Sequence, residues 1–229
     1  RFVHEWIAAA GPEQDAARWK EAAGVAASRV LREFAPNQSR EKSLHEATLC
    51  QTLGGVFWQL RDLESAERML RKAREWRVAY LTNSIPGGLS LVSETLYSLA
   101  VVLRARGRDG EAEKLLHETL SLTNPALGDR GLNPSDPLVV DILHLLALVY
   151  SDRKAWVEAD TRYREALALA QRIEPEGGRR TVRSLRSLAA LFTRLGQGPA
   201  AERLLQQADE MALHLPPENE ADHTPFQPE

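Results

Sequence analysis

Six histidines and one cysteine are the side chains in this sequence whose chemistry could support catalysis or metal binding. The histidines are His4, His45, His117, His144, His214 and His223. They are scattered, form no HExxH pattern and show no metal-ligand spacing. Isolated histidines on helices are usually surface or packing residues, so we expect no catalytic residue and no metal site.

The cysteine and the glycine pairs also favour structural roles. Cys50 occupies a large-residue position in an apolar stripe, so we expect it to be buried and not to act as a nucleophile. The glycine pairs are Gly54-Gly55, Gly87-Gly88 and Gly177-Gly178. None is followed by the Lys-Ser/Thr of a phosphate-binding loop, so we expect no cofactor.

The composition describes a folded protein without a global charge that would select a partner. The 229 residues are 43% hydrophobic and carry a formal net charge of -3, which argues against nucleic-acid binding. We expect no membrane insertion, because no apolar run approaches the length of a membrane span. A single cysteine fits a reducing compartment, so a cytoplasmic location is the default, although the sequence begins at Arg1 and a removed targeting segment stays open. The Ala-, Leu- and Arg-rich usage hints at a bacterial source.

An internal repeat of small residues organises the chain. Two small residues twelve positions apart recur four times, as Gly54 and Ala66, Ala100 and Ala112, Ala147 and Ala159, and Ala189 and Ala201. An acidic residue directly follows each later member, as Glu67, Glu113, Asp160 and Glu202. Small residues at this spacing allow two antiparallel helices to approach closely, so each unit is predicted to be a helical hairpin.

The apolar residues and the helix breaks support the same hairpins. In the first helix of each unit, apolar residues recur at spacings of three and four, as in Leu143, Leu146 and Tyr150. Breaks fall at Gly107, at Asp152-Arg153 and between Gly196 and Pro199, where the hairpins need turns. We therefore expect an all-α fold with about nine to ten helices.

These residues resemble the tetratricopeptide repeat family. The third unit matches its pattern best, with Leu143, Leu146, Ala147, Tyr150, Ala159, Tyr163 and Ala166. The units are longer than the usual period of about 34 residues. They resemble the extended subtype of kinesin light chains, whose linker is matched by Leu127-Gly128 and Asp136-Pro137. The resemblance implies a right-handed α-solenoid of antiparallel helix pairs, and it supplies no catalytic residues.

The expected organisation is a partial leading unit, four repeats and a tail. The leading unit spans residues 1–40, with a break at Gly11-Pro12. The four repeats cover residues 43–214, as 43–82, 88–124, 135–173 and 179–214. Residues 215–229 are acidic and proline-containing, which favours a flexible tail. No capping helix follows the fourth unit, so we expect either a longer parent protein or homo-oligomers formed through uncapped ends.

The family resemblance implies that the first helices line a concave groove where a protein or peptide binds. The predicted groove residues are Thr48, Gln51, Trp58, Gln59, Glu94, Tyr97, Arg104, Asp141, His144, Asp152, Arg183, Arg186 and Arg194. Trp58 follows the packing residue Phe57 and is turned about 100° from it, so groove and core both stay open for it. For Trp156 we favour the core.

Arg183, Arg186 and Arg194 lie in the first helix of the fourth unit. They favour a partner segment with acidic residues, because guanidinium groups pair well with carboxylates. The alternative is that the arginines pair internally with Asp141 and Asp152. The predicted function is a non-catalytic protein-interaction scaffold. A spacer or oligomerisation unit that uses the solenoid ends is the second possibility, and an enzyme is a remote third.

Overall fold

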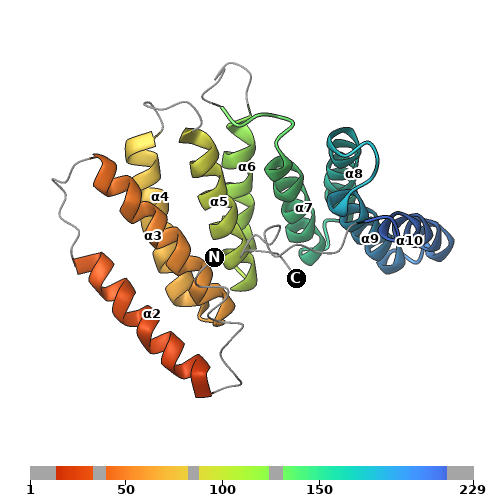
Figure 1. Ribbon diagram of the computed structural model, residues 1–229. Coiled ribbons are helices and arrows are strands. Elements are labelled where there is room, and N and C mark those ends of the chain that lie inside the picture. Colours follow the sequence, from red (N-terminus) through yellow and green to blue (C-terminus); the bar gives the residue numbers. More distant parts are fainter. Residues whose placement is uncertain (1–13, 33–39, 82–87, 124–130, 216–229) are drawn as a thin grey trace. The chain divides into compact units, whose positions relative to one another are not determined.

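The computed structural model describes residues 14–32, 40–81, 88–123 and 131–215 of the chain. All regular structure within these residues is α-helical, in nine helices (Figure 1). Their bounds are α2 (Gln14–Arg32), α3 (Arg40–Gln59), α4 (Leu63–Leu81), α5 (Gly88–Ala105), α6 (Asp109–Ser121), α7 (Pro137–Asp152), α8 (Trp156–Ile173), α9 (Arg179–Arg194) and α10 (Gly198–Ala212). The expected break at Gly11-Pro12 and the expected tail beyond Leu215 lie outside the described residues.

The chain divides into two compact units between Gly107 and Arg108, in the turn that joins α5 to α6. Helices α2 to α5 belong to the first unit and α6 to α10 to the second, and each unit is described by itself. Within a unit, helices joined by a short turn run antiparallel and lie side by side. We refer to α3, α5, α7 and α9 as first helices and to α4, α6, α8 and α10 as second helices. The prediction of an all-α fold is confirmed for the described residues.

A residue with positive φ lies two positions beyond the end of each first helix and seven positions after its small residue. These residues are Arg61, Gly107, Lys154 and Gly196, with φ of 56°, 71°, 61° and 73°. Within a unit, the left-handed conformation reverses the chain so that the second helix can return along the first. Glycine adopts this conformation without steric strain, whereas Arg61 and Lys154 each lose roughly 1 kcal/mol of conformational free energy in it. The equal spacing shows that the four turns are built alike.

Within each unit, buried small residues bring the two helices of a pair together. The small residues of all four predicted pairs are buried, and none of the alanines among them is more than 3% exposed. At Gly54, an added Cβ atom would lie 2.8 Å from the Cγ atom of Leu70, so only glycine fits this crossing without a shift. Close packing of this kind stabilises the pair through many small dispersion contacts.

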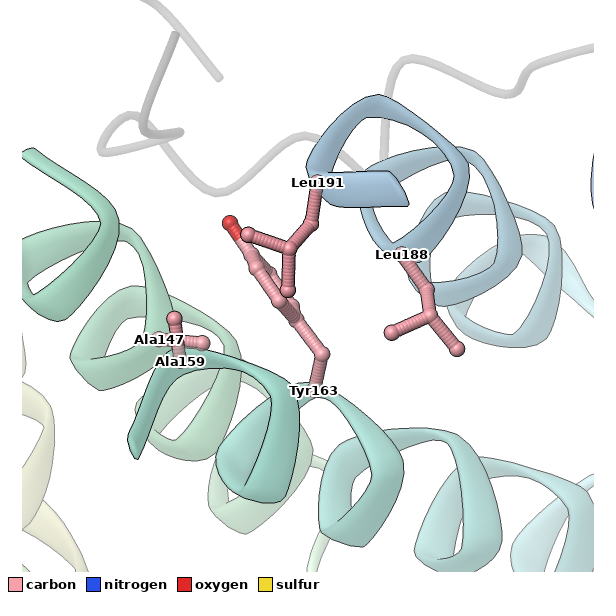
Figure 2. Packing of buried hydrophobic residues seen from close by; sticks show 5 residues of the cluster. All are labelled: Ala147, Ala159, Tyr163, Leu188 and Leu191. Atoms are coloured by element: carbon pink, nitrogen blue, oxygen red, sulfur yellow. The ribbon is translucent and has the colours of Figure 1, made fainter. Parts of the chain in front are cut away.

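The best-defined cluster of the second unit shows how one pair joins the next. Ala147 of α7 and Ala159 of α8 are fully buried, and Tyr163 of α8 extends from this seam toward Leu188 and Leu191 of α9 (Figure 2). The aromatic ring therefore belongs both to its own pair and to the contact with the following first helix. Removing the ring would therefore weaken the packing among α7, α8 and α9.

Ion pairs to the acid of a second helix add polar contacts to these junctions. In the first unit, Glu67 of α4 is only 5% exposed and accepts hydrogen bonds from Arg106, just beyond α5, and from Arg71, the latter at 2.7 Å. In the second unit, Glu113 of α6 pairs with Arg153, just beyond α7. Both junction arginines lie six residues after the small residue of the first helix. The acid noted in the sequence thus holds the end of the next first helix.

At the junction between α8 and α9, the acid pairs with an arginine of its own helix instead. Leu195 occupies the position that Arg106 and Arg153 have in the earlier repeats. Asp160 of α8 pairs with Arg164 of the same helix at 2.8 Å, and the Arg164 guanidinium lies 5.5 Å from the ring centroid of Phe192 in α9. A cation–π contact therefore links α8 to α9 where the other junctions have an inter-helix ion pair.

One helix of the described part, α5, is long and apolar enough to cross a membrane by length and composition. Of its 18-residue window, 72% is buried inside the structure. Core helices of folded proteins pass the same test, and burial explains why α5 is so apolar.

We expect Ala159→Leu to lower the free energy of unfolding by about 1–3 kcal/mol, because the larger side chain overpacks a fully buried crossing. Ala168→Leu, an exposed position of the same helix, is the matched control and should change stability by less than about 0.5 kcal/mol. Urea unfolding followed by circular dichroism measures both. Equal midpoints for the two variants would show that Ala159 is not at a tight crossing.

Asp62 gives a pH-dependent contribution to the α3–α4 turn. Burial by itself raises the pKa of Asp62, but the hydrogen bond from the Ser65 N–H and the contact with Lys20, 3.1 Å away, lower it more. The folded-state pKa is therefore below the ordinary value, so the stabilisation is present above the unfolded-state pKa of about 4 and is lost as the pH falls through the folded-state pKa.

We expect Asp62→Asn to be less stable than the wild type by about 0.5 kcal/mol at pH 7, because asparagine keeps the helix cap but loses the charge, and the pair with Lys20 is partly exposed to solvent. The difference should stay constant down to about pH 5 and shrink below about pH 4. Urea unfolding at several pH values measures it. A difference that grows toward acidic pH would contradict the sign argued above.

Candidate functional site

The first helices of the second unit are linked by a line of polar contacts. The three contacts are Asp141 with Arg183, His144 with Ser187 and Ser151 with Arg194. His144 Nε2 lies 2.6 Å from the Ser187 hydroxyl, and Arg194 donates to the Ser151 hydroxyl at 3.0 Å. Each contact joins α7 to α9 and spans one repeat length in the sequence. We call these six residues the polar ladder.

The buried end of the ladder carries its strongest electrostatic contact. Asp141 is 8% exposed, and Arg180 adds a second cation, with its Nε atom 3.7 Å from Asp141 Oδ2. His144 is 4% exposed, and its ring meets Tyr163 edge-on at 5.5 Å between centroids. The other end is open, because the Arg194 side chain is exposed. The α7 members of the ladder are all buried, whereas along α9 exposure rises from the partly buried Arg183 and Ser187 to the exposed Arg194.

The three predicted arginines do not share one environment. Arg183 is paired with Asp141, which is the internal pairing that the sequence left open as an alternative. Arg186 reaches the opposite side of α9 and pairs with Asp209 of α10 at 2.9 Å. Arg194 returns to the α7 side but contacts a neutral hydroxyl. The structure thus brings Arg183 and Arg194 onto the ladder and places Arg186 away from it.

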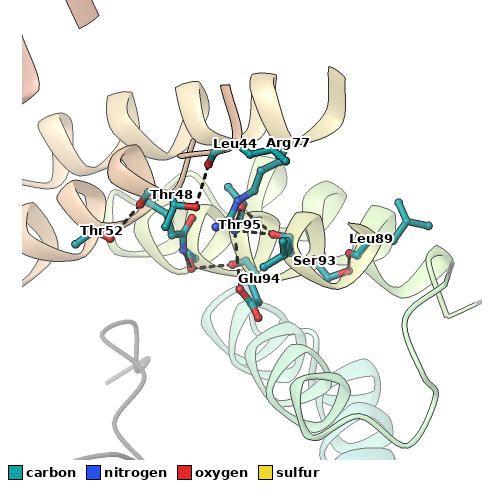
Figure 3. Close-up of polar contacts among 11 residues, drawn as sticks. Leu44, Thr48, Thr52, Arg77, Leu89, Ser93, Glu94 and Thr95 are labelled. Atoms are coloured by element: carbon teal, nitrogen blue, oxygen red, sulfur yellow. Dashed lines mark hydrogen bonds and ion pairs between the residues drawn. The ribbon is translucent and has the colours of Figure 1, made fainter. Parts of the chain in front are cut away.

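In the first unit, the contacts between first helices are fewer. Gln51 of α3 donates to the Ser98 hydroxyl of α5 at 2.9 Å, one repeat apart, as in the polar ladder. Glu94 has its carboxylate 3.9 Å from the buried Arg77 of α4, which also donates to Thr95 at 2.7 Å (Figure 3). The Arg77 guanidinium has its pKa lowered by burial, an effect that Glu94 opposes. This charge joins α4 to α5 and is not presented to a partner.

The other predicted site residues are more buried or more dispersed than expected. Tyr97 is 5% exposed, so it offers little surface for a partner. Trp58, Gln59 and Arg104 are partly buried, and the Thr48 hydroxyl donates to the carbonyl of Leu44 within its own helix. Asp152 is exposed at the end of α7. These residues stay predictions as partner contacts.

Two members of the polar ladder were not predicted from the sequence, although a signal for them was present. Ser151 and Ser187 were not singled out, yet each holds a predicted site residue. Both lie one repeat length from their partners, so the repeat spacing that relates first helices could have identified them. Arg77 gave no such signal, because a buried arginine resembles a surface one in sequence.

Possible metal ligands and the single thiol are the remaining chemically reactive groups of the described residues. No group of three or more His, Cys, Asp or Glu residues that could hold a metal ion occurs in the described part of the chain. Cys50 is fully buried, as predicted, and burial raises the pKa of its thiol to about 11. Lys72 lowers this pKa and Glu46 raises it, both by less than burial does. A thiol with that pKa is almost fully protonated near neutral pH and is a poor nucleophile.

Comparison with known families decides the classification. Two models described as tetratricopeptide repeat match residues 92–133 and 138–213, which together make up just over half of the chain. The chain belongs to the tetratricopeptide repeat family. As a tetratricopeptide repeat protein it is a protein–protein interaction scaffold of a generally non-catalytic family. A search of curated proteins found no significant match.

Solved structures support the same fold for this tetratricopeptide repeat protein. A kinesin light chain from Podosopora anserina with nearly identical TPR-like repeats has a TM-score of 0.65 at 19% identity, over 86% of this chain and 88% of that chain. BtubC (BKLC) from P. vanneervenii has a TM-score of 0.57 at 16% identity, covering 91% and 97%. MamA from Desulfovibrio magneticus RS-1 gives 0.52 at 15% identity, covering 89% and 98%. At these identities the likeness shows the fold, which confirms the predicted class of helical-repeat solenoid.

We expect the Cys50 thiol of this repeat protein to react with a disulfide reagent at pH 8 at least about 100-fold more slowly in the folded chain than in denaturant. The raised pKa and full burial both lower the concentration of accessible thiolate. Absorbance of the released chromophore measures the rate. Comparable rates with and without denaturant would contradict a buried, protonated thiol.

Proposed function

We propose that this tetratricopeptide repeat protein binds a segment of another protein along the face of α7 and α9, with Arg194 as the anchor for an acidic side chain. The family supplies the general role of interaction scaffold. The polar ladder supports this location, because it joins two first helices through groups that also suit a peptide. A cytoplasmic location and a bacterial source remain expectations that accompany this proposal.

The observation that carries the proposal is the difference between the partners of the three arginines. Arg183 already has a carboxylate partner in Asp141, so an incoming acid would only replace one ion pair with another. Arg186 has Asp209. Arg194 is exposed and donates to a neutral hydroxyl, so a partner carboxylate would add charge-assisted hydrogen bonds. Of the three, Arg194 therefore gains most from an acidic partner.

Burial along the ladder suggests the order of contacts. Asp141 and His144 are buried and fix the spacing between α7 and α9, so a partner does not have to order them. The exposed end at Arg194 is available to the partner. Such an arrangement gives a preformed surface with one charged anchor. Binding should weaken as the salt concentration rises, because the anchor is open to solvent.

We expect peptides selected on the intact chain to lose affinity for an Arg194→Glu variant by about tenfold, equivalent to about 1.4 kcal/mol. The probe is a displayed library of random 12-residue peptides, and binders should be enriched in Asp and Glu. Arg186→Glu on the same helix is the matched control and should change affinity by less than about twofold, since Arg186 faces α10. Fluorescence anisotropy of labelled peptides measures each affinity.

Two outcomes would contradict this site. Selected peptides that bind the wild type and Arg194→Glu equally would place the binding surface elsewhere. Failure to select any peptide, together with concentration-dependent self-association in sedimentation, would favour the alternative function as a spacer or oligomerisation unit. A thermal melt separates binding from stability, because Arg183→Glu should lower the melting temperature by placing two carboxylates together.

A further inference from the structure

The exposed face of α10 repeats a residue pattern that is buried on the earlier second helices. Four residues after the small residue, a large apolar side chain occurs as Leu70, Leu116, Tyr163 and Leu205. The first three are 0%, 0% and 3% exposed, but Leu205 is 41% exposed. Figure 2 shows the reason for the third, since Tyr163 lies toward Leu188 and Leu191 of the following first helix. Leu205 is exposed where its counterparts are covered.

The acid that directly follows the small residue of α10 is likewise without the arginine partner found at the first two junctions. Glu67 and Glu113 are held by Arg106 and Arg153, which follow the next first helix. Glu202 is exposed and makes no hydrogen bond or ion pair within the part of the chain that the structure describes. An apolar contact and a charge contact are therefore both open at the same place.

The two contacts lie on one side of α10. At 100° per residue, Glu202 projects about 60° and Leu213 about 80° from Leu205. Leu213, one residue beyond the end of α10 and still in helical backbone conformation, is 83% exposed and extends the apolar surface. We define the α10 face as Glu202, Leu205 and Leu213. Its combination of an acid beside apolar side chains matches the junctions that bind first helices inside the chain.

We propose that the α10 face docks an amphipathic helix of a partner protein, with the apolar stripe of that helix on Leu205 and Leu213 and an arginine on Glu202. The junctions define the pattern, because Arg106 and Arg153 each lie six residues after the small residue of their first helix. The partner helix should therefore carry apolar residues at spacings of three and four and an arginine six residues after a small one. This surface is distinct from the α7–α9 face.

A second copy of this chain fits the face less well than another protein does. Arg106 and Arg153 are already paired with Glu67 and Glu113, and the fourth first helix has Leu195 at the corresponding position. At this position, six residues after the small residue, the described first helices thus lack an arginine without an acidic partner. The charge pattern therefore selects a helix from a different protein.

The test uses the full chain and a labelled peptide of residues 137–154, which carries the first-helix pattern and Arg153, with a neutral solubilising tail. We expect binding by fluorescence anisotropy that weakens about fivefold in Glu202→Arg and about tenfold in Leu205→Ser. The peptide with Arg153→Glu should bind Glu202→Arg more tightly than it binds the wild type. Glu210→Arg, an exposed acid of the same helix, is the control and should change affinity by less than about twofold.

The charge exchange makes the outcome decisive. Equal binding of the peptide to the wild type, Glu202→Arg and Leu205→Ser would overturn the proposal, as would absence of binding to a wild-type chain with a native helical spectrum. Self-association in sedimentation that Leu205→Ser abolishes would also overturn it, in favour of a second copy. Because Glu202 and Leu205 are exposed, these variants should retain the wild-type circular dichroism spectrum.

Discussion

The close approach of two helices at small side chains is the interaction on which the rest of this structure depends. Gly54 leaves space for Leu70, and Ala147 and Ala159 allow Tyr163 to reach the following helix. A larger residue at such a crossing would separate the helices and remove dispersion contacts along their whole length. The turns, the junction ion pairs and the polar ladder can form only when the paired helices lie this close together.

Polar residues have divided roles around this apolar framework. Acids on the second helices, such as Glu67 and Glu113, hold the end of the next first helix through arginine. Hydroxyl, imidazole and carboxylate groups on the first helices join neighbouring repeats, as His144 does with Ser187. Most charged groups on the repeat surface are therefore already used within the fold. We therefore expect a partner to bind where a charge lacks an oppositely charged neighbour or where a contact repeated elsewhere in the chain is not made.

These considerations separate two surfaces of one scaffold. Arg194 is a cation with a neutral partner on a face between first helices, whereas Glu202 is an exposed acid on a second helix. The first suits an acidic segment and the second a basic amphipathic helix. A scaffold with two surfaces of opposite charge can bring two different proteins together without catalysing a reaction.

The sequence by itself determined the helical class, the small-residue crossings, the turns and the burial of Cys50, because all of these follow from local spacing and side-chain size. It also marked the acids after the small residues, but not their partners about 40 residues away. Only the tertiary structure decided which arginines have an acidic partner. Arg183, Arg186 and Arg194 share one helix, yet they contact α7, α10 and α7 respectively. Long side chains select partners from the neighbouring helices, and the positions of those neighbours are fixed only when the repeats pack.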